Sequence, residues 1–295
     1  MKFEGSYTAL VTPFNEKDEI DEKTLIDLIN FQIEANTDAL VLSGTTGESP
    51  TLSEKEKLFL FKTAVKESKN KIKIIAGTGT NNTKNSVELS KKAKDVGVCG
   101  LLIVIPYYNR PSEIGILKHF EEISKVGLPI ILYHHPKRTG TKLSFNFFKM
   151  LKNIENVKAI KEASSDLNYM KEIKGYTNLP IFSGDDPLIV DIFKSGGVGS
   201  ISVISNIIPK VWKKITDLCL NKQFDKAQII LNEYLPLIES IFLESNPICT
   251  KYALSLMNKC NLRLRLPLIE PSENSKEIIK KEILKKALLS EELLI

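Results

Sequence analysis

The sequence predicts an α/β protein, a (β/α)8 TIM barrel with a C-terminal helical extension. Eight short apolar runs recur along the chain, and a segment with helical periodicity follows each of them. The runs are continuous rather than alternating, as expected for parallel strands that are covered on both faces. Such a succession of β-then-α units favours a closed barrel over an open doubly wound sheet, which usually has fewer strands.

The predicted strands are recognised by their aliphatic and β-branched content, and they cover residues 7–11, 39–42, 72–76, 101–105, 130–133, 157–161, 181–183 and 199–203. Ser53 followed by Glu56 has the spacing of a capping box, in which each side chain satisfies a free amide of the first helical turn. Pro187 stands at a first helical position, where its missing N–H is tolerated. Gly97 and Gly196 stand where helices are expected to end.

After about residue 221 the strand pattern disappears. Segments 224–244, 247–259 and 275–294 all have the periodicity of amphipathic helices, and a linker with two prolines separates the last two. We therefore predict a barrel over residues 1–222 and a C-terminal helical region over residues 223–295.

Charge and composition argue against a nucleic-acid partner. The net charge is +5, but only four of the 41 Lys and Arg residues are Arg, and the lysines are scattered along the predicted helix faces. Scattered lysines are typical of a solvated surface, whereas nucleic-acid binders gather their basic residues on one face.

Neither a targeting segment nor a metal site is indicated. Residues 1–13 lack the apolar core of a signal peptide, and the longest apolar runs are too short to cross a bilayer. The four cysteines lie far apart without a CxxC pair, so we interpret them as buried free thiols in a reducing compartment. We expect a cytoplasmic protein with no membrane contact, no metal and no cofactor.

Lys161 is the candidate catalytic residue. The active site of a (β/α)8 barrel forms at the C-terminal ends of the strands, and Lys161 ends the strand predicted at 157–161. Period-two alternation places Val157, Ala159 and Lys161 on one face, which would put the amine at the mouth of an apolar interior. Burial would lower its pKa from about 10.4, and a neutral amine can attack a ketone to form a Schiff base. The alternative is a lysine that extends past the strand end into solvent.

Other polar residues at strand ends fit the same chemistry. Tyr133 ends the neighbouring strand and is a candidate proton shuttle, with a rim aromatic as the alternative. Thr45 and Thr46 stand between glycines and offer hydroxyls and amides to a small carboxylate, although such a stretch also forms plain turns. Arg138 stands out in a chain that uses Lys nearly everywhere. Its planar guanidinium could hold a carboxylate by two hydrogen bonds.

Several motifs together resemble one family. They are GTTGE (44–48), PYYN (106–109), YxxPxRTG (133–140), KEAS (161–164), GDD (184–186), SNP (245–247) and RLP (265–267). Their order and spacing are similar to those of the dihydrodipicolinate synthase / N-acetylneuraminate lyase family, and the resemblance runs from residue 5 to about residue 268.

The resemblance implies a lyase that forms a Schiff base with pyruvate through Lys161. Thr45 and Thr46 would hold the pyruvate carboxylate. Gly184 and Ile201 match positions that line the pyruvate pocket in this family.

The resemblance also implies a proton relay and an assembly. Tyr133 would pass protons and be coupled through Thr46 to Tyr108. Tyr108 would reach into the site of a neighbouring subunit, because members of the family are usually homotetramers built from tight dimers.

Arg138 indicates the second substrate. By resemblance, members that condense pyruvate with L-aspartate 4-semialdehyde, on the diaminopimelate–lysine route, have an arginine here for the carboxylate of the aldehyde. Sialic acid lyases and sugar-acid aldolases of the family generally lack it. We expect the synthase activity; the alternatives are a lyase that acts on a sugar acid and a non-catalytic relative, which would normally have lost Lys161 or Tyr133.

Two departures from the family pattern affect this interpretation. His134 and His135 replace the usual Asn-Val; at most one of them should face the site, and we expect the imidazole at the rim. Lys57 stands where lysine-inhibited members have an imidazole or a carboxylate, and Asn85 stands where they have a carboxylate. A cation and a neutral amide are poor partners for a cationic ligand, so we expect lysine to inhibit weakly or not at all.

Overall fold

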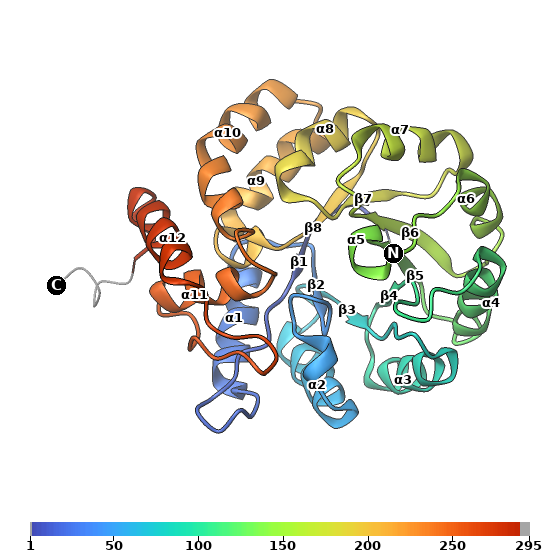
Figure 1. Ribbon diagram of the computed structural model, residues 1–295, viewed down its shortest axis with the longest axis horizontal. Helices are drawn as coiled ribbons and strands as arrows, with labels where there is room; N and C mark the ends of the chain where they lie inside the picture. Colours follow the sequence, from blue (N-terminus) through green and yellow to red (C-terminus); the bar gives the residue numbers. More distant parts are fainter. Residues whose placement is uncertain (1, 290–295) are drawn as a thin grey trace.

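The computed structural model describes residues 2–289, and its centre is a closed barrel of eight parallel strands (Figure 1). Strand order follows chain order, and β8 closes the barrel against β1, where Tyr7 pairs with Ile201. The strands are β1 (Gly5–Ala9), β2 (Ala39–Leu42), β3 (Lys73–Gly77), β4 (Gly100–Val104), β5 (Ile130–His134), β6 (Val157–Glu162), β7 (Ile181–Ser183) and β8 (Gly199–Ser202). The predicted fold class is confirmed.

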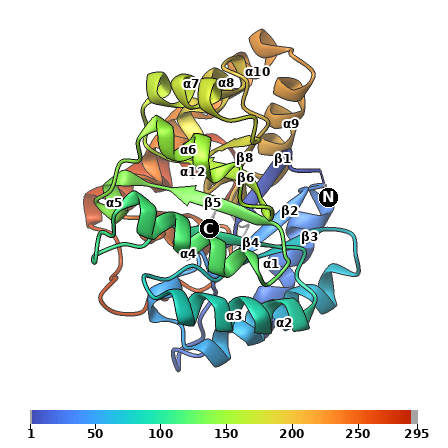
Figure 2. The ribbon, with the colours of Figure 1, turned by 90° about the vertical axis from the view of Figure 1, so that its right-hand side faces the viewer.

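Helices surround the barrel, as the two perpendicular views show (Figures 1 and 2). They are α1 (Glu22–Glu34), α2 (Glu54–Ser68), α3 (Thr83–Val96), α4 (Glu113–Ser124), α5 (Pro136–Thr139), α6 (Phe145–Leu151), α7 (Leu167–Tyr176), α8 (Ile189–Lys194) and α9 (Pro209–Leu220), with short 3-10 turns η1 (Ser49–Thr51), η2 (Asp186–Leu188) and η3 (Ile204–Asn206). The predicted capping box opens α2: the Ser53 hydroxyl accepts the Glu56 amide, and Glu56 accepts the Ser53 amide at 2.8 Å.

Three further helices form the C-terminal extension, α10 (Phe224–Ser240), α11 (Ile248–Leu256) and α12 (Glu273–Lys285). They stand on one side of the barrel, where α10 packs against α9 and α12 packs against α10 and α11 (Figure 1). Residues 290–294 of the helix predicted at 275–294 lie outside the described residues. The division of the chain at residue 222 remains a prediction.

The apolar core has two layers, because successive strand residues face opposite sides of the sheet. One layer fills the barrel and includes Tyr7, Ile131, Phe182 and Ile201. The other lies between the strands and the surrounding helices, and the fully buried Trp212 of α9 belongs to it. The inner layer is the floor on which the site is built.

Two local predictions need correction. β1 begins at Gly5, because its pairing with β8 starts there, and the chain leaves the ladder after Ala9, where the Val11 amide bonds to the Asn206 side chain. Cys219, Cys249 and Cys260 are buried as predicted, but Cys99, directly before β4, is exposed. Within residues 2–289, no helix is long and apolar enough to cross a membrane.

Candidate active site

A cavity of about 430 Å³ lies at the C-terminal ends of the strands, and we call it the central cavity. Lys161, Tyr133, Thr45 and Thr46 all contribute to its wall, so the tertiary structure brings together residues that are far apart in the sequence. Arg138 also contributes to it from α5.

Lys161 and Tyr133 form the centre of this site. They are register partners on β6 and β5, and both point into the barrel because each occupies an inward position of its strand. Lys161 is 5% exposed and Tyr133 is 6% exposed. The Lys161 Nζ lies 4.3 Å from the centroid of the Tyr133 ring. The alternative of a lysine that extends into solvent is therefore wrong.

Burial makes the amine of Lys161 reactive. It lowers the Lys161 pKa to about 8, against the opposing charges of Asp186 and Asp185, and the positive charge of Arg138 adds to the lowering. Roughly a tenth of the amine is then neutral at pH 7, far more than for an ordinary lysine, and the neutral form is the one that attacks a carbonyl carbon.

Tyr133 is held in its protonated form. Burial raises its pKa to about 12, while the nearby Arg138 and a hydrogen bond with the Thr45 side chain act in the opposite direction. A phenol of this kind keeps its proton at neutral pH and can lend it to a neighbouring oxygen and take it back.

The two threonines have different partners from those expected. Tyr133 is linked to Thr45, whereas the Thr46 hydroxyl accepts a hydrogen bond from the Asn246 side chain at 2.9 Å. This arrangement differs from the expected coupling of Tyr133 through Thr46, which stays a prediction.

Gly184 leaves the space that Lys161 occupies. A Cβ at position 184 would lie 2.5 Å from the Ala163 Cβ and 3.0 Å from the Lys161 Cε. A side chain here would collide with Ala163 and crowd the lysine, so the glycine follows from the packing around the amine. Gly184 is also part of the cavity wall, as expected.

Asp186 is a site residue that stands out in the sequence only as part of the GDD motif. Its carboxylate accepts the backbone amides of Val203 at 3.0 Å and Ile204 at 2.8 Å. Burial raises its pKa to about 6, and the two amide bonds and the charge of Lys161 moderate the rise. The carboxylate thus ties η2 to the end of β8 beside the amine.

The two histidines occupy opposite faces of β5. His134 is fully buried between the barrel and the helices, and its Nδ1 lies 2.6 Å from the Glu162 carboxylate. His135 contributes to the wall of the central cavity, and burial, together with Arg138 and Lys161, lowers its pKa to about 4. The expectation that at most one imidazole faces the site is confirmed, since His135 contributes to the cavity wall and His134 does not. His135 is a neutral member of the site.

Tyr108 and Ile201 lie outside the central cavity. Tyr108 follows β4 with a φ of 71° and is 91% exposed. Ile201 is fully buried in the barrel interior, where it belongs to the same apolar layer as Tyr133.

A second cavity of about 320 Å³ adjoins the first, and we call it the side cavity. Thr45, Tyr133 and Arg138 line both cavities, while Ser49, Lys57 and Tyr107 line the side cavity. Burial lowers the pKa of Lys57, and the Glu54 carboxylate partly offsets this. In the part of the chain that the structure describes, no group of three or more His, Cys, Asp and Glu side chains is arranged to hold a metal ion.

The fold and the site define a class: a (β/α)8 enzyme with a buried amine and a phenol at the mouth of the barrel. The particular family follows from comparison. The sequence profile of the dihydrodipicolinate synthetase family matches residues 2–287, and the chain belongs to this family.

Individual relatives agree with this assignment over nearly their whole length. The chain is 41% identical to the 4-hydroxy-tetrahydrodipicolinate synthase of Caldicellulosiruptor bescii over 95% of both chains. Its structure is similar to that of the Aquifex aeolicus dihydrodipicolinate synthase, with a TM-score of 0.95, 36% identity and coverage of 98% of this chain and 100% of that one. The Acinetobacter baumannii dihydrodipicolinate synthase, solved in complex with pyruvate, gives a TM-score of 0.95, 35% identity and the same coverage. The predicted family and enzyme class are confirmed.

Proposed function

We propose that this protein condenses pyruvate with L-aspartate 4-semialdehyde to form 4-hydroxy-tetrahydrodipicolinate. The observation that carries the proposal is the buried Lys161 amine, with its lowered pKa, directly over the Tyr133 ring. The arginine beside it supports the choice of aldehyde, because Arg138 offers a planar cation to a second carboxylate.

In the proposed reaction, the neutral Lys161 amine attacks the keto carbon of pyruvate. Tyr133 passes a proton to the resulting oxygen, and loss of water leaves an iminium. The iminium withdraws electrons from the pyruvate methyl group, which loses a proton to give an enamine. The enamine carbon then attacks the aldehyde carbon and forms the new C–C bond. Attack of the aldehyde substrate's own amine on the former keto carbon closes the ring and releases Lys161.

The polar wall of the central cavity has proposed roles in binding. Thr45 and Thr46 hold the pyruvate carboxylate with hydroxyl and amide groups, while Arg138 binds the carboxylate of the aldehyde. Thr45 has a second role, because its hydrogen bond with Tyr133 connects the proton relay to the carboxylate end of the substrate. Gly184 keeps the space around the Lys161 side chain open.

The decisive experiment follows consumption of L-aspartate semialdehyde with pyruvate, combined with mass spectrometry of borohydride-treated protein. Turnover together with a reduced pyruvate adduct on Lys161 is the expected result. Lys161→Ala should give no adduct, whereas Tyr133→Phe should still give one. An adduct without turnover would redirect the search to sugar-acid aldehydes, and the absence of an adduct would overturn the proposal.

Arg138→Ala separates the synthase from the sugar-acid alternative. It should reduce kcat/KM for aspartate semialdehyde by about 100-fold, because a bidentate charged contact is lost, while pyruvate trapping continues. Arg138→Lys should recover only part of the loss. If Arg138→Ala retained full activity, the aldehyde assignment would be wrong.

We further propose that the enzyme is a cytoplasmic homotetramer in which Tyr108 acts in the site of a neighbouring subunit. The 91% exposure of the Tyr108 ring and its position after β4 support this, since the ring has no place in its own central cavity. Mixing Tyr108→Phe subunits with Lys161→Ala subunits should restore activity, because each mixed pair contains one site with both residues. Activity that stays absent after mixing, or a monomer in light scattering, would contradict the proposal.

A further inference from the structure

We propose that Asn246, from the C-terminal extension, is a positioning residue that sets the direction in which the Thr46 hydroxyl donates its proton. This inference rests on the proposed function, because it assigns the recipient of that proton as the pyruvate carboxylate. The residue lies 200 positions away from Thr46 in the sequence, in the connection between α10 and α11.

The geometry of the contact is specific. The Asn246 Nδ2 donates to the Thr46 Oγ1 at 2.9 Å, and the Thr250 hydroxyl donates to the Asn246 Oδ1 at 3.4 Å. The second contact orients the amide so that its NH2 group faces Thr46. Both Thr46 and Asn246 line the central cavity, and Thr46 is 2% exposed.

The chemistry of an amide decides what this contact does. An NH2 group only donates, so the Thr46 oxygen must act as acceptor toward Asn246, and the hydroxyl hydrogen points elsewhere. Thr46 has no other hydrogen bond from its side chain among the described residues. The hydrogen is therefore available to a ligand in the central cavity. An acceptor such as a carboxylate matches it, and the contact with a charged acceptor is stronger than one between neutral groups.

A separate set of contacts fixes the loop that carries Thr46. Two residues further on, the Glu48 carboxylate accepts the Lys251 ammonium at 2.5 Å, and both side chains are fully buried. The other Glu48 oxygen accepts the Arg265 amide at 3.1 Å, and the Gly47 carbonyl accepts the Thr12 hydroxyl at 2.7 Å.

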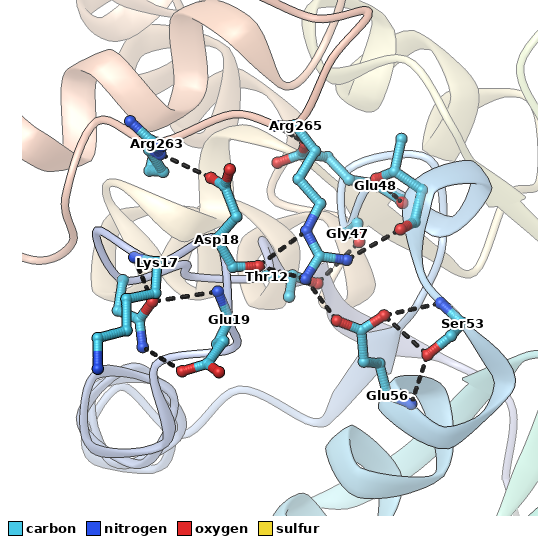
Figure 3. A network of polar contacts seen from close by, with 12 residues as sticks. Thr12, Lys17, Asp18, Glu19, Gly47, Glu48, Ser53, Glu56, Arg263 and Arg265 are labelled. Carbon is cyan, nitrogen blue, oxygen red and sulfur yellow. Dashed lines mark hydrogen bonds and ion pairs between the residues drawn. The ribbon is translucent and has the colours of Figure 1, made fainter.

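Figure 3 shows how this anchor continues beyond Glu48. The Arg265 guanidinium donates to the Asp18 carbonyl and the Glu56 carboxylate, and Arg263 pairs with the Asp18 carboxylate at 2.6 Å. The position of the 44–48 loop is thus maintained without Asn246. Removing the Asn246 amide should therefore change the orientation of one hydroxyl and leave the loop in place.

The test compares four single variants and one double variant. Asn246→Ala removes the donor, and Asn246→Asp replaces the NH2 group with an acceptor of the same shape. Thr46→Val removes the hydroxyl with little change of volume, and Thr46→Ser retains it. The double variant combines Asn246→Ala with Thr46→Val. For each protein, the pyruvate concentration for half-maximal borohydride trapping and the KM and kcat of turnover are measured.

Asn246→Ala should raise the half-saturating pyruvate concentration about 10-fold, with kcat within about threefold of the unaltered protein. Asn246→Asp should raise it by about 100-fold, because the carboxylate turns the Thr46 proton away from the ligand and repels its charge. Thr46→Ser retains the hydroxyl and should therefore raise the half-saturating pyruvate concentration less than Thr46→Val does. The double variant should be no worse than Thr46→Val alone, because both changes remove the same interaction.

Two results would overturn the inference. One is unchanged pyruvate saturation in Asn246→Ala, and the other is an effect of the double variant equal to the product of the single effects. A general structural role would instead lower the melting temperature and kcat without changing pyruvate saturation. If the unaltered protein formed no pyruvate adduct, the proposed function would be wrong, and so would the assignment of pyruvate as the ligand of Thr46. If the unaltered protein formed the adduct and Asn246→Ala showed normal pyruvate saturation, only this inference would be wrong.

Discussion

Tyr133 and Lys161 are register partners on adjacent strands, and the Lys161 nitrogen lies 4.3 Å from the centroid of the Tyr133 ring. The pairing of β5 with β6 therefore sets the distance between the proposed nucleophile and the proposed proton donor. Directly behind it, the next pair in the same register, His134 and Glu162, forms a buried contact of 2.6 Å on the outer face of the two strands. The site is thus held by rigid elements instead of by loops alone.

Removal of the Tyr133 hydroxyl should separate proton transfer from binding. Tyr133→Phe should lower kcat by about 100-fold or more, because general acid–base catalysis is lost, while pyruvate binding is largely retained. Steady-state kinetics and borohydride trapping measure the two effects.

Tyr7→Phe is the matched control for that experiment. The Tyr7 hydroxyl is buried in the barrel interior and has no hydrogen-bond partner among residues 2–289. Its removal should leave kcat unchanged and should not lower the melting temperature, because a buried unpaired polar group is lost. Equal losses of activity in both variants would argue against a specific role for Tyr133.

The rate of Schiff-base formation should depend on pH through Lys161. Burial lowers its pKa to about 8, so the reactive neutral amine increases as pH rises toward that value. The pyruvate kcat/KM should therefore rise about 10-fold per pH unit well below 8 and level off above it. A pH profile of initial rates checks this, and a rate that falls between pH 6 and 8 would contradict it.

Lys161 should also reduce the stability of the folded protein near neutral pH. Its folded pKa of about 8 lies below the ordinary value of 10.5, so the folded state binds fewer protons than the unfolded chain across that window. The contribution of Lys161 to the free energy of unfolding is thus unfavourable below pH 8 and improves as pH rises toward 10.5. Lys161→Met should stabilise the protein at pH 7 by about 2–3 kcal/mol in urea denaturation.

Lys251→Met is the matched control for Lys161→Met, because Lys251 is also buried but has a carboxylate partner. Removing it leaves the fully buried Glu48 anion without its 2.5 Å contact. The variant should lose about 3–5 kcal/mol of stability. Destabilisation of similar size in both variants would show that volume, and not charge, decides the outcome.

L-Lysine should inhibit the enzyme weakly or not at all. Lys57 places an amine in the side cavity, where it would repel a cationic ligand. A titration of the initial rate with L-lysine checks this prediction. Strong inhibition at L-lysine concentrations below about 1 mM would contradict it. Lys57→Glu should increase any inhibition, since it reverses the charge at this position.

The amino-acid pattern was enough to predict the order of strands and helices, the inward position of Lys161 and the start of α2 at Ser53 and Glu56. These features depend on local periodicity and on contacts between residues a few positions apart, which the sequence pattern contains. The inward face of β6 followed from simple alternation. The boundary of β1 did not, because it depends on pairing with β8 at the other end of the barrel.

Which side chains meet in the site follows from the three-dimensional structure and not from the sequence pattern. The structure assigned Thr45 to Tyr133 and Thr46 to Asn246, it placed His135 in the cavity wall, and it paired Glu48 with Lys251. Two adjacent hydroxyls are equivalent in a sequence, and their partners lie on other strands or about 200 residues further along the chain. The direction of each hydroxyl depends on the backbone turn after β2 and on the position of the C-terminal extension. Closure of the barrel and packing of that extension set both, and no local pattern encodes them.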